Sequence, residues 1–148
     1  MSTGCGSRSS NCRRCVSNPS GPWSRSASGA AFTAGRRYRL ALWRNWNSGE
    51  GRILFVGLNP SSADESRDDP TLRRCIGFAR RWGYGGLLMA NLFALRATRP
   101  QQLRAARDPV GDGTDRWLAW LAADAAMIVA CWGNHGSMLD RDRTFSAR

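Results

Sequence analysis

The chain has 148 residues, which suits one domain of ordinary size, and 42% of them are hydrophobic, enough to build a core. No run approaches the ~18 apolar residues of a membrane span, and no apolar stretch typical of a secretory signal follows the N-terminus. These features exclude an integral membrane protein, and they predict a cytoplasmic protein with no membrane partner.

The net charge of +11 is typical of a protein that binds nucleic acid, but the charge is unevenly distributed. Residues 1–49 hold eight arginines and no acid, giving +8, whereas residues 50–148 hold fourteen arginines and eleven acids, giving +3. The expected folded part is therefore only mildly basic. All 22 basic residues are arginine, which a GC-rich coding bias would also produce.

Residues 1–30 are rich in Ser, Gly, Arg, Asn and Pro, which predicts a disordered tail before a single domain over 31–148. Cys12 and Cys15 form a C-x-x-C pair in this tail, with Cys5 nearby. A zinc site needs four ligands, and the only histidine, His135, lies far away. Reduced, exposed thiols without metal are expected, with zinc as the alternative. The tail is also what a misassigned start site would produce.

Ordered structure is expected to begin near Phe32. The apolar side chains of Tyr38, Leu40 and Leu42 alternate with less apolar ones, which predicts a half-buried strand over 38–44. The apolar run Ile53–Val56 predicts a strand over 52–58 that is buried on both faces. The first of these is expected to be an antiparallel edge strand, hydrogen-bonded to the second.

A helix is predicted over 70–82, because Asp69 can cap its start and Pro70 suits its first position. Apolar residues at helical spacing predict its buried face; they are Leu72, Cys75, Ile76 and Ala79. Its outward face carries four arginines: Arg73, Arg74, Arg80 and Arg81. That face is either simply solvated or a ridge that contacts phosphates.

The remaining patterns predict a strand over 87–92, a short helix over 101–107, a helix over 115–124 capped by Thr114, and a buried strand over 127–132. This alternation predicts an α/β fold, with a short, mainly parallel sheet in a three-layer α/β/α arrangement. The strands near 52–58, 87–92 and 127–132 are expected to be parallel to one another.

Parallel strands end at the same edge of a sheet, where ligands of open α/β folds bind. The sequence therefore predicts one crevice formed by polar residues at the strand ends: Asn59, Asn91, Arg96, Asn134 and His135. An amide offers both a donor and an acceptor, which suits a planar, neutral ligand. Three nearby carboxylates could hold a metal or act as a base, although capping and solvation also explain them: Asp64, Asp68 and Asp69.

Several motifs over residues 30–137 resemble a bacterial and phage family catalogued as domain of unknown function 1643: GLNPSSAD, DDPTLRRC, GYGG, NLFALRATRP, DPVG and WGNHG. This resemblance implies no particular activity. More distantly, GLNPS is similar to the GxNPG motif of the uracil-DNA glycosylase superfamily. ANLFALRATRP resembles the superfamily's TNxVKxRP strand end, and the strand running into WGNHG resembles a further segment near its active site.

The second resemblance implies roles for four of the site residues. Asn59 would orient the attacking water, Asn91 would read the edge of an extruded base, and Gly57 and Pro60 would shape the water loop. Further residues of the predicted base site are Leu58, Ser61, Arg96, Trp132 and Asn134, with His135 as a second catalytic candidate. Ser61 stands where the superfamily has Gly. Leu95 stands near a cluster cysteine of the iron–sulfur branches, so no cofactor is expected.

The superfamily also has a His-Pro motif on a further strand, which stabilises the departing base. This sequence has no His-Pro dipeptide and ends at Arg148, so the resemblance implies a domain truncated before its final strand. Two functions of different classes follow. One is a glycosylase-like hydrolase acting on a nucleobase or DNA; the other is a non-catalytic module that binds a nucleotide or nucleic acid. An inactive truncated member is a third possibility, and no protein partner is implied.

Overall fold

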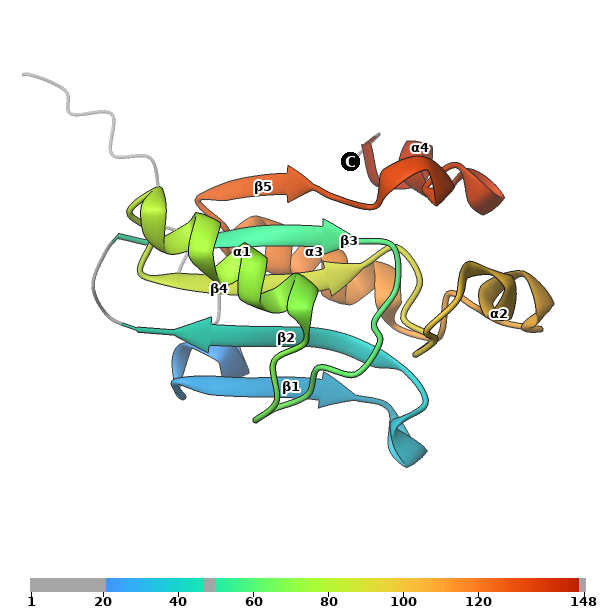
Figure 1. Ribbon diagram of the computed structural model, residues 1–148, viewed down its shortest axis with the longest axis horizontal. Helices are drawn as coiled ribbons and strands as arrows, with labels where there is room; N and C mark the ends of the chain where they lie inside the picture. The colour runs from blue at the N-terminus through green and yellow to red at the C-terminus, as the bar shows by residue number, and fades with distance from the viewer. Residues whose placement is uncertain (1–20, 47–49, 147–148) are drawn as a thin grey trace, which may run out of the picture.

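The computed structural model describes residues 21–46 and 50–146, which form a five-stranded mixed sheet with helices on both faces (Figure 1). The strands are β1 (Ser28–Phe32), β2 (Arg39–Asn45), β3 (Arg52–Gly57), β4 (Gly86–Asn91) and β5 (Met127–Ala130), in the spatial order β1-β2-β4-β3-β5. The α-helices are α1 (Pro70–Arg81), α2 (Pro100–Ala105), α3 (Thr114–Asp124) and α4 (Arg141–Ser146). Short 3-10 turns are η1 (Pro22–Ser24), η2 (Ala34–Arg36), η3 (Gly133–His135) and η4 (Met138–Asp140).

The parallel part of the sheet is built as the sequence predicts. β3 pairs in parallel with β4 on one side and with β5 on the other. The register sets Gly57, the last residue of β3, opposite Asn91, the last residue of β4. The α/β class and the parallel arrangement of these three strands are therefore confirmed, and two strand-end segments meet at one edge.

The neighbours of β2 differ from the prediction. β2 is antiparallel as expected, but it pairs with β1 and β4 and does not lie at an edge beside β3. Alternation of apolar residues says which face of a strand is buried and nothing about which strand lies next to it. β1 is not predicted from the sequence because it consists largely of small residues. One of them, Gly29, leaves space for the ring of Trp43 on β2.

The ordered chain also begins earlier than expected. Trp23 is fully buried, packs edge-on against Trp120 at 4.6 Å between ring centroids, and donates from Nε1 to Asp124 Oδ2 at 2.8 Å. The expectation of disorder is therefore wrong for residues 21–30, where one tryptophan provides the anchor that the surrounding Gly, Ser and Pro do not suggest. Residues 1–20, with the C-x-x-C pair, lie outside the described residues.

The third parallel strand is not buried as predicted. β5 lies at the edge of the sheet, and Met127 and Ile128 are 46% and 44% exposed. The structure also has the short elements η3, η4 and α4 after β5, where no element is predicted. Among residues 21–46 and 50–146, no helix combines the length and apolar character needed to span a membrane.

The helices cover the two faces of the sheet and create two cores. α1 begins at Pro70 as predicted, and its Leu72, Cys75 and Ala79 pack with Ile53 and Phe55 on one face. α3 places Leu118 and Leu121 in the core of the opposite face. Thr114 is the first residue of α3, and its hydroxyl donates back to the Val110 carbonyl rather than capping the helix.

Candidate functional site

A small cavity of about 200 Å³ lies where β3 and β4 end, beside the first turn of α1. It is lined by Arg39, Gly57, Leu58, Asn59, Pro60, Ser61, Asp69, Thr71, Met89, Asn91 and Cys131. The structure thus brings together six of the ten predicted site residues, namely Gly57, Leu58, Asn59, Pro60, Ser61 and Asn91. The parallel register of β3 and β4 explains why the segments meet.

Asn91 is the buried amide of the cavity, with only 5% of its surface exposed. Its Oδ1 accepts a hydrogen bond from Nη2 of Arg39 at 3.1 Å. Its Nδ2 points to Gly57, because a Cβ added to that glycine would lie 2.9 Å from this nitrogen. Asn91 therefore turns its donor end to the cavity rim, and Gly57 leaves the space for it.

Arg39 also lines the cavity, is 2% exposed and belongs to β2. Its Nη1 donates to the Ala63 carbonyl at 2.9 Å, while its Nε has no hydrogen-bond partner among the described residues. Burial lowers the pKa of Arg39 to about 10, although the nearby Asp69 opposes this shift. The guanidinium therefore stays charged at neutral pH and places a buried positive charge beside the cavity.

Sequence reasoning missed Arg39, because its alternation with Tyr38 and Leu40 suggests an outward-facing charge. The loop after β3 crosses this face of the sheet, so that the Ala63 carbonyl covers the side chain. Predicting this burial requires knowing where the loop after β3 lies, and the residue pattern of β2 alone does not give that information.

Asn59 is half-buried and uses its donor end to hold the loop. Its Nδ2 donates to the Ala97 carbonyl at 2.7 Å and to the Pro60 carbonyl at 3.0 Å. No described residue donates to its Oδ1, so this oxygen can accept a hydrogen bond from water or ligand. Asn59 and Asn91 thus offer opposite groups, an acceptor and a donor.

The three carboxylates of this region all make structural contacts. Asp69 caps α1 by accepting from the Leu72 amide at 2.8 Å, and it also accepts from the Ser61 hydroxyl at 3.2 Å. Asp68 pairs with Arg44 at 2.9 Å. Hydrogen bonds from the backbone amides of Ser66 and Arg67 lower the pKa of Asp64. Within the described ranges, no group of three or more His, Cys, Asp or Glu residues is placed to hold a metal.

The other four predicted residues lie outside the cavity. Arg96 contacts the cavity wall from outside: its Nε donates to the carbonyl of Ser61, a lining residue, at 3.3 Å. Trp132 packs edge-on against Phe145 at 5.8 Å and lines a separate apolar hollow of about 660 Å³ between α3, β5 and α4. Asn134 and His135 are exposed on η3 and are not among the cavity residues. The chain turns toward α4 directly after β5, which carries the WGNHG segment away.

A pair of cysteines, which the sequence did not predict as part of the site, adjoins the cavity. Cys131 lines the cavity, and its Sγ donates to the Val56 carbonyl at 3.2 Å. A hydrogen bond between the thiols of Cys75 and Cys131 raises the pKa of Cys75 and lowers that of Cys131. Cys131 is therefore the more readily ionised of the two thiols.

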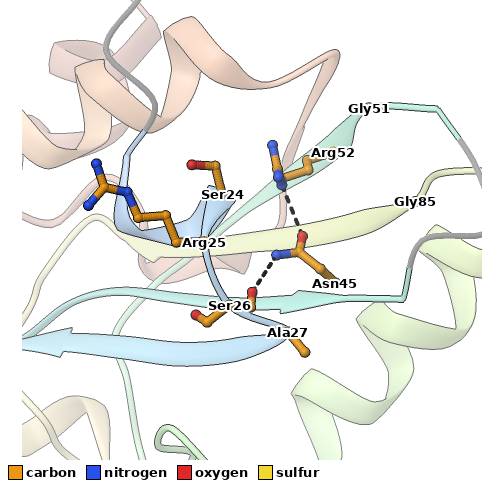
Figure 2. A pocket seen from close by; sticks show the side chains of 8 residues that line it. All are labelled: Ser24, Arg25, Ser26, Ala27, Asn45, Gly51, Arg52 and Gly85. Carbon is orange, nitrogen blue, oxygen red and sulfur yellow. Dashed lines mark hydrogen bonds between the residues drawn. The ribbon is translucent and has the colours of Figure 1, made fainter.

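Another polar hollow, of about 330 Å³, lies at the opposite end of the strands (Figure 2). There Asn45 accepts from Arg52 Nε at 2.9 Å and donates to the carbonyls of Ser26 and Trp23 at 2.9 and 2.7 Å. These bonds tie the segment before β1 to the start of β3. The amide of Asn45 is thus committed to holding the fold together, and the cavity at the strand ends is the better candidate for a functional site.

Fold and cavity together define an α/β domain with a polar site at the ends of parallel strands. The chain belongs to the family described as "Protein of unknown function (DUF1643)", which it matches over residues 37–147. The family predicted from the sequence motifs is thereby confirmed. Comparisons with curated proteins and with solved structures give no match, so the likeness to uracil-DNA glycosylases gains no support from them.

Proposed function

We propose that the cavity binds a nucleobase and that the protein hydrolyses the bond between this base and its sugar. The observation that carries the proposal is the pairing of Asn59 and Asn91 in one cavity, one with an available acceptor and the other with an available donor. A volume of about 200 Å³ suits one planar heterocycle better than a whole nucleotide. Base-processing enzymes extrude their target base into a pocket of this kind.

Asn91 would hold the base. Because Asn91 turns its oxygen to Arg39 and its NH₂ group toward Gly57, it presents the NH₂ group to a ligand in the cavity. The ligand atom that meets this NH₂ group is an acceptor, such as a keto oxygen or an unprotonated ring nitrogen. The cavity would read one edge of the base through this hydrogen bond.

Arg39 would stabilise the departing base. Negative charge develops on the base as the bond to the sugar breaks, and a fixed buried charge stabilises it more strongly than water would. The guanidinium lines the cavity beside Asn91, and its hydrogen bond to Oδ1 polarises the amide that would contact the base. In this proposal Arg39 takes the role that the His-Pro motif has in the glycosylase superfamily.

Asn59 would orient the water through its Oδ1. In the step, the water oxygen bonds to the anomeric carbon of the sugar while the carbon–nitrogen bond breaks. The bonding electron pair leaves with the base, which receives a proton from the water. The sugar keeps the hydroxyl group, so atoms and charge balance.

A non-catalytic base-binding module is the second candidate, and the contacts of Asp69 favour it. This carboxylate lines the cavity, but the Leu72 amide and the Ser61 hydroxyl already donate to it. It is therefore less available as a general base than an uncommitted carboxylate would be.

A base-release assay on oligonucleotides carrying uracil or other altered bases separates the two candidates. For a hydrolase, wild-type protein releases base, and Asn59→Ala retains binding while losing release by about 100-fold or more, since it acts on the water. For a binding module, neither protein releases base, although both bind. A folded protein that neither binds nor releases would contradict both.

A further inference from the structure

The flank of α1 that leads away from the cavity carries two exposed aromatic rings. Phe78 and Trp82 are 43% and 49% exposed, and their rings stack at 5.3 Å with an angle of 25° between the planes. They are four residues apart, so they share one side of the helix. Trp82 also stacks on the buried ring of Phe55 at 6.4 Å, which fixes the exposed pair to the core.

Arginines accompany these rings. α1 carries four arginines and no acid, and none of the four belongs to a salt bridge within the described residues. Arg74 and Arg81 lie four residues before and three residues after Phe78, so they flank the aromatic pair. The guanidinium of Arg81 lies 5.9 Å from the centre of the Phe78 ring. Solvation accounts for exposed arginines, but not for two half-exposed aromatic rings stacked between them.

The same flank begins at the cavity. Thr71 lines the cavity, and Arg74, Phe78 and Trp82 follow it at helical spacing. Phe78 lies seven positions after Thr71, a distance of about 10 Å along the helix axis. A few linked nucleotides can cover that distance.

We propose that this flank of α1 binds single-stranded nucleic acid, with a base stacked against the exposed Phe78–Trp82 pair and phosphates against Arg74 and Arg81. Aromatic platforms set in a positively charged surface are the usual means of binding single strands, because every base has a face to stack. A duplex keeps its bases stacked on one another and cannot offer them to the rings. The link to the cavity rests on the proposed function, since it places a neighbouring base of the same strand at Asn91. Binding by the flank itself involves separate residues.

Fluorescence anisotropy with a labelled oligodeoxythymidylate and with a duplex of the same length tests this proposal. We expect tighter binding of the single strand, and Phe78→Ala should weaken it by about 5- to 100-fold, the usual effect of losing one stacked base. Phe78→Tyr keeps the aromatic face and should bind as the wild type does. Arg74→Ala and Arg81→Ala should each reduce the slope of log K against log salt by about 0.7.

The matched control is Arg116→Ala, since Arg116 is exposed on α3 at the opposite face of the sheet. All variants are compared in the full chain, because residues 1–20 carry three arginines of their own. Single-strand affinity unchanged by Phe78→Ala, or reduced equally by Arg116→Ala and Arg81→Ala, would overturn the proposal. A thermal melt shows whether Phe78→Ala folds, and the Arg74 and Arg81 variants test the same surface without removing a ring.

The outcome is separable from that of the proposed function. Loss of single-strand binding in Phe78→Ala without base release by any variant would support the α1 surface and contradict the hydrolase. If Phe78→Ala releases base and binds single strands as tightly as the wild type, the result would support the hydrolase and contradict the α1 surface.

Discussion

Arg39 donates from Nη2 to the Oδ1 of Asn91 over 3.1 Å, and this contact decides which end of the amide faces the cavity. A guanidinium has only donors, so the amide must present its oxygen to Arg39 and turn its NH₂ group toward Gly57 and the cavity. The residue that gives the site its donor is thus itself held by a charge buried in the neighbouring strand.

Arg39→Met should destabilise the fold by about 1–3 kcal/mol, because the Ala63 carbonyl and Asn91 Oδ1 would both lose their donor inside the protein. Urea denaturation measures the change. Arg37→Met is the control, since Arg37 is exposed two residues earlier and should lose little. Equal stability of the two variants would show that Arg39 does not hold the site together.

Gly57→Ala should disturb the cavity, because the new Cβ would lie 2.9 Å from Asn91 Nδ2, which Arg39 prevents from turning away. We expect lower stability and weaker ligand binding, measured by thermal melting and titration. Gly77→Ala is the comparison: Gly77 lies inside α1 with nothing within 4 Å of an added Cβ. That change should stabilise the protein by about 0.5–1 kcal/mol. A Gly57→Ala protein as stable as Gly77→Ala would contradict this packing.

Cys131 should be alkylated faster than Cys75 at neutral pH. The hydrogen bond from Cys75 lowers the pKa of Cys131, so a larger fraction of this thiol is ionised below the ordinary thiol pKa. Iodoacetamide labelling followed by peptide mass spectrometry measures both rates, and it also distinguishes the cysteines of residues 1–20. In Cys75→Ala the rate at Cys131 should fall and its pH midpoint should rise. An unchanged midpoint would show that the thiols do not interact.

The sequence was sufficient to predict those parts of the site that follow from local patterns. Apolar runs ending at Gly57 and Asn91 predict parallel strands, and parallel strands must bring their ends together. Asp69 and Pro70 together mark the start of α1, as the structure confirms. These features depend on residues close together in the chain.

What could not be predicted depends on contacts between distant segments. Arg39 is buried by a loop some 24 residues further on, through the Ala63 carbonyl. β1 is held by pairing with β2 and not by any apolar pattern of its own. Trp132 packs against Phe145 and does not line the cavity at the strand ends. Its segment WGNHG nevertheless follows β5 in the same way that the other polar loops follow β3 and β4. The direction of the chain after β5 depends on the packing of Trp132 against α4, which lies further along the sequence.

The most direct test of the central claim, that Asn91 binds a base through its NH₂ group, is a calorimetric titration of wild-type protein and Asn91→Asp with uracil and deoxyuridine. The aspartate keeps the shape of the side chain and an acceptor for Arg39, but its carboxylate has no donor for the ligand, and a thermal melt shows whether the variant folds. We predict binding by the wild type and an affinity at least about 10-fold lower in Asn91→Asp. Equal affinities in the two proteins, or a folded wild type that binds neither compound, would contradict the account.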